Sequence, residues 1–138
     1  MIGTLSEQEI DAILRRQRIG RLACSLNDRP YVVPISYAYD GAYVYGYTAP
    51  GRKLETMRQQ PQVCFEVDEI THDSCWHTVV AEGEFEELDE GLARDHAIVQ
   101  LTKSGGGLVP RGLGEPNGMV VFRIRLTDRS GRFERRDA

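Results

Sequence analysis

Residues 31–53 read YVVPISYAYDGAYVYGYTAPGRK, and this stretch carries the strongest structural signals of the 138-residue chain. Aromatic and β-branched residues, which favour strands, dominate it on both sides of the Asp40-Gly41 pair. An Asp-Gly pair between two such runs is typical of a β-hairpin turn. Pro34 interrupts the first run and has no amide hydrogen to donate, so we expect this strand at a sheet edge or a bulge. The stretch therefore predicts an antiparallel hairpin with a free edge.

Further strands and helices are predicted on both sides of this hairpin. The six predicted strands are residues 19–26, 31–39, 42–48, 62–69, 77–88 and 119–127, and the predicted helices are residues 7–18, 52–59 and 89–102. The first helix begins with a capping box, in which Ser6 and Glu9 each bond the other's backbone amide. Six short strands with tight hairpins predict a mainly β protein with flanking helices, built as a small antiparallel barrel. Side chains fill a barrel of this size, so a sizeable ligand is expected outside it, at a subunit boundary.

Composition narrows the class of protein. Lys and Arg total 17 against 21 Asp and Glu, a net charge of −4, whereas sequence-independent nucleic-acid binding needs a basic face. No apolar run approaches the roughly 18 residues of a membrane span, and the N-terminus lacks the segments of a signal peptide. We therefore expect one soluble, cytoplasmic domain over residues 1–138, with a polar tail at 129–138 and no nucleic-acid or membrane partner. Residues 103–118, rich in Gly and Pro, are expected to form a functional lid or an exposed flap.

Three cysteines and two histidines raise the question of a metal site. Cys24 and Cys64 lie in apolar strands and are interpreted as small buried hydrophobic residues without a disulfide. Cys75 lies close to His72 and His77, but the spacing matches neither a C-x-x-C knuckle nor a helical H-x-x-x-H pair. We therefore predict no metal site, and haem ligation by one of the two histidines stays open as an alternative.

The end of this stretch, residues 48–53, is a candidate phosphate-binding site. The segment Thr48-Ala49-Pro50-Gly51 leads from a strand into a predicted helix that begins with Arg52 and Lys53. The first backbone amides of a helix have no internal partners and the helix dipole favours an anion there, so two cations at this position are locally unfavourable. A bound phosphate would resolve the conflict, since it accepts from the helix amides, from both cations and from the Thr48 hydroxyl. The alternative is that both cations are solvated surface charges.

Several segments are informative as an ordered set. They are GRLA at 20–23, PYVVPISY at 30–37, YTAPGRK at 47–53, PQVCFEVD at 61–68, WHTVVAEG at 76–83 and GRFER at 131–135. This set resembles the pyridoxamine 5′-phosphate oxidase-like family of FMN-binding split barrels, and in particular its nitroimidazole-reductase branch. The resemblance covers residues 5–136. It departs at Tyr47, where this branch commonly has a histidine.

The resemblance implies a split barrel that forms a homodimer, with two flavin sites at the dimer interface. It implies that Arg52 and Lys53 hold the FMN phosphate, that the backbone of residues 33–36 lines the isoalloxazine ring, and that residues 76–78 approach from a neighbouring strand. The cofactor-binding residues expected on this basis are Val33, Pro34, Ile35, Ser36, Tyr47, Thr48, Arg52, Lys53, Trp76 and Thr78. No acid–base pair or nucleophile has a convincing spacing, so no catalytic residue is assigned.

Three functions remain as hypotheses. The first is a flavin-dependent oxidoreductase that passes electrons from a reduced nicotinamide to a small-molecule acceptor, with FMN performing the redox step. No Rossmann G-x-G-x-x-G occurs, so the nicotinamide would bind transiently over the flavin. The alternatives are a deazaflavin-dependent reductase and a non-enzymatic protein that stores or senses a flavin or haem.

Overall fold

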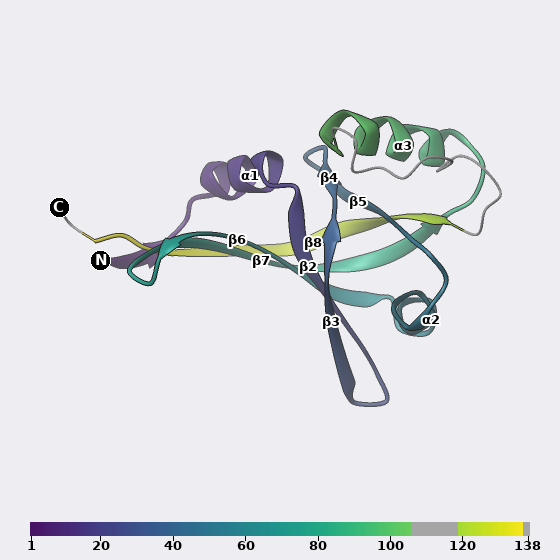
Figure 1. The fold of residues 1–138 in the computed structure, drawn as a ribbon, viewed down its shortest axis with the longest axis horizontal. Helices are drawn as coiled ribbons and strands as arrows, with labels where there is room; N and C mark the ends of the chain where they lie inside the picture. Colours follow the sequence, from purple (N-terminus) through teal and green to yellow (C-terminus); the bar gives the residue numbers. More distant parts are fainter. Residues whose placement is uncertain (106–118, 137–138) are drawn as a thin grey trace.

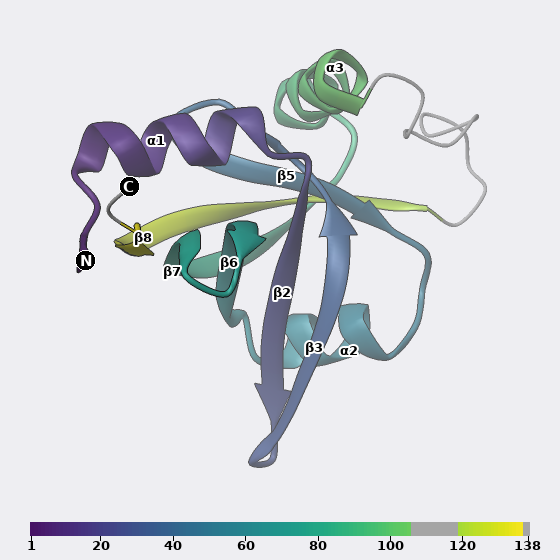
Figure 2. The same ribbon diagram turned by 60° about the vertical axis from the view of Figure 1, so that its left-hand side comes forward.

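The computed structural model describes residues 1–105 and 119–136 and shows a strongly curled antiparallel sheet flanked by helices (Figures 1 and 2). The strands are β1 (Ile2–Thr4), β2 (Ile19–Leu26), β3 (Arg29–Ser36), β4 (Ala38–Tyr39), β5 (Tyr43–Thr48), β6 (Gln62–His72), β7 (Cys75–Leu88) and β8 (Val120–Glu134), and the helices are α1 (Glu7–Arg16), α2 (Arg52–Gln59) and α3 (Leu92–Gly105). The strand order is β3-β2-β6-β7-β8-β5-β4, with β1 paired to β8. The predicted fold class is confirmed: the chain is mainly β with flanking helices, and the curled sheet forms a split barrel.

The sheet has eight strands in the part of the chain that the structure describes, rather than the predicted six. Residues 31–39 form two strands, because pairing with β2 ends near Tyr37, whose amide donates to the carbonyl of Arg18 at 3.0 Å. The chain then pairs β4 with β5 across the predicted Asp40-Gly41 turn, where Gly41 has a φ of 98°. The additional β1 is three residues long, too short to show an alternating pattern, and pairs with the end of β8.

The last strand is longer than predicted, because β8 continues to Glu134 instead of ending at residue 127. Its final part pairs with β7 on one side and with β1 on the other. Phe133 is buried, and a Cβ added at Gly131 would lie within 3.0 Å of Leu5 and Ile10. Since Gly131 has no side chain, the alternation that marks a strand is hidden in the sequence at this point.

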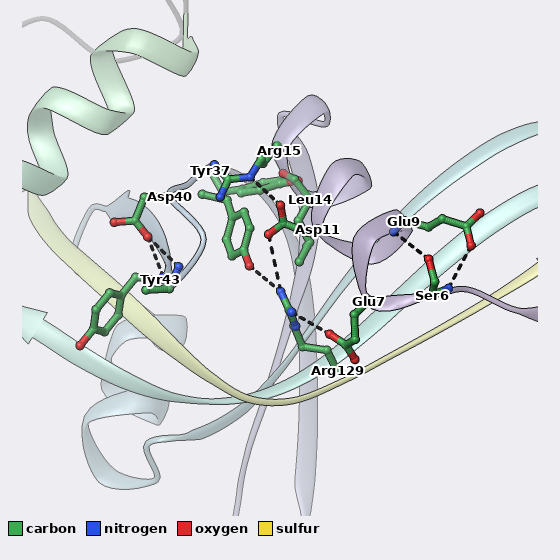
Figure 3. A network of polar contacts seen from close by, with 12 residues as sticks. Ser6, Glu7, Glu9, Asp11, Leu14, Arg15, Tyr37, Asp40, Tyr43 and Arg129 are labelled. Atoms are coloured by element: carbon green, nitrogen blue, oxygen red, sulfur yellow. Dashed lines mark hydrogen bonds and ion pairs between the residues drawn. The ribbon is translucent and has the colours of Figure 1, made fainter.

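The concave side of the sheet holds the main hydrophobic core, to which two helices contribute. Their buried residues in this cluster are Ile10, Ile13 and Leu14 of α1 and Leu54 and Met57 of α2. The predicted capping box begins α1: the Glu9 amide donates to Ser6 Oγ at 3.2 Å, and the Ser6 amide donates to Glu9 Oε1 at 3.0 Å (Figure 3). Side chains thus fill the interior, as expected for a small barrel.

Of the other two helices, one has the predicted bounds and one begins later than predicted. The prediction of residues 52–59 is confirmed for α2, whereas α3 begins at Leu92 instead of near Asp89, after Gly91 with a φ of 147°. Residues 106–118, which make up most of the predicted loop and lid, lie outside the described residues. Within the described parts of the chain, none of the helices is long and apolar enough to cross a membrane.

Candidate functional site

The start of α2 is an uncapped helix N-terminus. Gly51 occupies the N-cap position, and no side chain bonds the first amides of the helix. A Cβ added at Gly51 would meet no atom within 4 Å, so the space in front of the helix is open. The unpartnered amides and the helix dipole give this open space a positive character that suits an anion.

The side chain of Arg52 is held in place by an aromatic ring. Its Cζ atom lies 4.7 Å from the centroid of the Tyr31 ring in β3. The guanidinium face is used in this contact, which leaves the N–H groups on its edge able to donate to a ligand. Within residues 1–105 and 119–136, Arg52 forms no ion pair with a carboxylate.

Lys53 is half-buried next to the sheet, and burial lowers its pKa. The thiol of Cys24 in β2 interacts electrostatically with Lys53. Burial raises the pKa of Cys24, and the charges of Lys53 and Arg52 partly offset this effect. The described residues provide no carboxylate for Lys53, so a half-buried cation stands beside the open helix N-terminus without a counter-ion.

Two open cavities lie along the β2–β3 hairpin, and Arg52 lines one of them. The hairpin cavity, of about 540 Å³, is lined by Leu26, Asn27, Arg29, Tyr31, Arg52 and Thr56. The sheet cavity, of about 450 Å³, is lined mainly by β2 and β6, including Ala23, Cys24, Pro30, Cys64 and Glu82. Figure 2 shows α2 beside this hairpin, and Arg52 at the start of the helix lines the hairpin cavity.

Thr48 and Tyr47 close strand β5 and face opposite sides of the sheet. Thr48 is buried and its hydroxyl donates to the Ala49 carbonyl at 2.9 Å, so donation to a phosphate would require this hydrogen bond to be exchanged. Tyr47 packs against the second hydrophobic cluster, which includes Leu101 of α3, and burial raises its pKa. Thr48 thus lies three residues before Gly51 on the approach to α2, whereas Tyr47 lies on the α3 side.

Strand β3 carries the four residues predicted to line a flavin ring. It is the terminal strand of the sheet, and Pro34 lies opposite Arg21 of β2, so the predicted edge position is confirmed. Val33 and Ile35 face the core, whereas Pro34 is exposed on the outer face and Ser36 is half-buried. No described strand pairs with the far side of β3, which leaves its backbone groups available to a flat ligand.

Trp76 and Thr78 lie near the opposite end of β7 from α2. Trp76 Nε1 donates to Glu134 Oε1 at 3.0 Å, and Thr78 Oγ1 donates to Glu66 Oε2 at 3.1 Å. The part of β7 that reaches α2 is Glu87, which pairs with Arg58. No hydrogen bond or ion pair joins Trp76 or Thr78 to Arg52 or Lys53 among the residues that the structure describes.

Sequence reasoning missed a carboxyl pair on the outer face of the sheet. Arg21 Nη1 lies 3.8 Å from Glu66 Oε1 and 3.5 Å from Asp68 Oδ2, and the buried Glu66 Oε1 has no hydrogen-bond partner among the described residues. Burial, together with the neighbouring Asp68 carboxyl, raises the pKa of Glu66 to about 7. The available signal was the i, i+2 spacing of the two acids within a strand, which places them on one face.

The histidines and cysteines do not assemble a metal centre in the described parts of the chain. Both ring nitrogens of His77 are engaged, since Nδ1 lies 3.2 Å from Glu69 Oε1 and Nε2 lies 3.3 Å from Arg135 Nη2. Haem ligation by His77 through Nε2 would require the contact with Arg135 to be exchanged. All three cysteines are free, and Cys24 is buried as predicted, whereas Cys64 is only half-buried and lines the sheet cavity.

Comparison with known proteins identifies a matching family and a relative of similar length. The family model described as pyridoxamine 5′-phosphate oxidase matches residues 6–133. A curated Rhizobium meliloti protein of uncharacterized function is 30% identical over 142 residues, covering 95% of this chain and 94% of the relative.

Two solved structures share the fold. A FAD-binding protein from Mesorhizobium loti is 40% identical, with a TM-score of 0.83, and the alignment covers 98% of this chain and 99% of the other. A protein from Bacteroides thetaiotaomicron that is predicted to confer 5-nitroimidazole antibiotic resistance is 16% identical, with a TM-score of 0.78 and coverage of 96% and 89%. The curled sheet, its free β3 edge and the family match over nearly the whole chain lead to one assignment: the protein belongs to the pyridoxamine 5′-phosphate oxidase-like family of FMN-binding split barrels.

Proposed function

We propose that this protein is a flavin-dependent oxidoreductase that binds the phosphate of its cofactor at the start of α2. The observation that carries the proposal is the phosphate cradle, which we define as the uncapped α2 N-terminus with Arg52 and Lys53. Both cations lack a carboxylate partner in the described residues, and Lys53 is half-buried. A half-buried cation without a counter-ion is costly unless a ligand supplies the opposite charge.

The residues of the cradle fit a phosphate monoester dianion in three ways. The Arg52 guanidinium, oriented by its stack on Tyr31, offers two parallel N–H donors on one edge. Lys53 adds a point charge from the sheet side, and the open space in front of Gly51 lets phosphate oxygens approach the helix amides. Charge-assisted hydrogen bonds of this kind contribute about 1.5–3 kcal/mol each.

The remaining predicted residues would orient the flavin ring. The free edge of β3 at Val33 to Ser36 offers backbone donors and acceptors to a flat heterocycle. Trp76 and Thr78 form no hydrogen bond or ion pair with the cradle in the described residues, and the family resemblance implies a homodimer, so we propose that a second copy completes the site. A flavin held there would supply the redox chemistry between a reduced nicotinamide and a small-molecule acceptor.

The sequence predicts FMN as the cofactor and a cytoplasmic location. The cradle recognises the 5′-phosphate end, which FMN shares with the larger FAD. The Mesorhizobium relative, which is 40% identical, is described as FAD-binding, so this dinucleotide is a second candidate cofactor. Deazaflavin cofactors also carry a phosphate at this position, and haem ligated by His72 or His77 is a further alternative.

The test is to purify the protein and to record the absorbance spectrum and the mass of the molecule that co-purifies. We expect a flavin spectrum, a dimer by light scattering, and oxidation of a reduced nicotinamide when an electron acceptor is added. A haem Soret band or a deazaflavin spectrum would show that the protein binds haem or a deazaflavin instead of a flavin. Flavin binding without turnover would indicate a storage protein, and failure to bind any flavin would contradict the proposal as a whole.

A further inference from the structure

The hairpin cavity continues from the phosphate cradle and is larger than a phosphate requires. Its volume is about 540 Å³, and Arg52 of the cradle forms part of its wall. The other walls come from the β2–β3 turn, through Leu26, Asn27 and Arg29, and from Thr56 on the second turn of α2. A ligand whose phosphate sits at the start of α2 thus has space to continue outward along the hairpin.

The charge at this cavity exceeds what one phosphate group needs. Arg29 is exposed and, like Arg52 and Lys53, forms no ion pair in the described residues. Three cations without carboxylate partners therefore gather at one corner of a chain whose net charge is −4. In a flavin dinucleotide each of the two phosphoryl groups carries a negative charge, so donors are needed at two positions instead of one. The cradle serves the first position, and Arg29, which lines the same cavity as Arg52, can serve the second.

The walls also suit a flat base. The Tyr31 ring and the Arg52 guanidinium stack at 4.7 Å and form a polarised planar wall. Leu26 adds an apolar surface, and Asn27, held in the turn with a φ of 53°, brings an amide that can donate to or accept from a purine edge. Apolar walls with a few convergent polar groups are typical of small-molecule sites.

We infer that the hairpin cavity is a subsite for the adenosine-phosphate half of a flavin dinucleotide, with Arg29 bound to the second phosphoryl group. The inference rests on the proposed function, because it places the first phosphoryl group in the cradle. It makes Arg29 the residue that distinguishes a dinucleotide from FMN, whereas Arg52 and Lys53 serve both.

The test compares FAD and FMN binding to the purified apoprotein by titration calorimetry. We expect the wild type to bind FAD at least about tenfold more tightly than FMN, since the dinucleotide adds a charge-assisted contact and a buried base. Arg29→Ala should remove most of this preference, with less than a twofold change in FMN affinity, and Arg29→Glu should invert it. Arg125→Ala, which removes an exposed arginine on β8, is the matched control and should change neither affinity.

Two results would overturn the subsite. One is equal affinity of the wild type for FAD and FMN, and the other is an Arg29→Ala variant that loses FAD and FMN affinity in equal measure. If the apoprotein binds neither flavin, the proposed function fails instead, so the two failures are distinguishable. Because Arg29 is exposed in a hairpin turn, its variants are expected to fold, and their circular dichroism spectra verify this.

Discussion

Charged side chains at the two ends of the curled sheet have opposite surroundings. Where α1 meets the ends of β6, β7 and β8, arginines hold carboxylates: the pairs are Arg16–Glu69, Arg129–Glu7 and Arg135–Glu9 (Figure 3 shows the second). At the start of α2, the cations are Arg29, Arg52 and Lys53, and none has a carboxylate partner in the described residues. The difference separates charges that support the fold from charges that are free to bind a ligand.

The largest effect is expected from removing the cradle cations. Arg52→Ala combined with Lys53→Ala should weaken flavin binding by at least about 100-fold, because two charge-assisted contacts are lost. The melting temperature should stay unchanged or rise slightly, since two cations leave a helix N-terminus. Calorimetric titration and thermal unfolding of the apoprotein measure the two quantities.

A control for this variant lies on the same helix. Arg58 pairs with Glu87 at 2.7 Å and with Glu55 at 2.9 Å, so Arg58→Ala should lower stability slightly and leave flavin affinity unchanged. If Arg58→Ala weakened flavin binding as much as the double variant does, the loss would reflect the general positive charge of the helix and not specific binding at the cradle.

The next largest effect is expected on stability, from the carboxylate of Glu69 where α1 meets the end of β6. Glu69 accepts from Arg16 and Gln17 and contacts His77, and the Arg16 and Gln17 hydrogen bonds hold the pKa of Glu69 at about 2 in spite of burial. Its folded pKa is below the ordinary value, so its contribution is present above pH 4.5 and is lost as the pH falls toward 2. Glu69→Gln should cost about 2–3 kcal/mol in urea unfolding at pH 7 and should leave flavin affinity unchanged. A stability equal to the wild type at pH 7 would show that this network is not structural.

Glu66 should respond to pH in the opposite direction. Its pKa is raised to about 7, so the folded state favours the protonated form, and that stability is present below pH 4.5 and lost as the pH rises through 7. Glu66→Gln should therefore raise the free energy of unfolding at pH 8 by about 1–2 kcal/mol and flatten its pH dependence between 4.5 and 7. A variant less stable than the wild type at pH 8 would mean that the ionised Glu66 is stabilised by Arg21.

The smallest effect is expected at an exposed pair. Arg125 Nη2 lies 3.1 Å from Glu84 Oε2, with both side chains about half exposed. Arg125→Ala should change the free energy of unfolding by less than about 0.5 kcal/mol, because solvent screens such pairs. A larger loss of stability would show that even an exposed ion pair contributes measurably to the fold.

Local signals predicted the parts of the fold that neighbouring residues determine. The capping box of Ser6 and Glu9, the Asp40-Gly41 turn and the bounds of α2 each depend on a few adjacent residues. The pair Arg52-Lys53 was found for the same reason, since the Pro-Gly bend before it marks the start of a helix.

Features that depend on contacts between residues far apart in the sequence could not be predicted from local signals. The end of β8 is a strand because β1 and β7 lie beside it, and Gly131 hides its alternation. Arg29 lies 23 residues before Arg52, and only the hairpin beside α2 brings the two to one cavity. The contacts of Glu66 and Asp68 with Arg21 and Thr78 depend on the pairing of β6 with β2 and β7, which no local signal predicts.

In the proposed function, Arg52, Lys53 and the first amides of α2 bind a flavin through its phosphate. The most direct test of this binding compares the affinities of FMN and riboflavin, which share the ring and differ in the phosphate, for the wild type and for the Arg52→Ala, Lys53→Ala double variant. We predict that the wild type binds FMN at least about 100-fold more tightly than riboflavin and that the double variant binds both with nearly equal affinity. Equal affinities in the wild type, or an undiminished FMN preference in the double variant, would contradict the account.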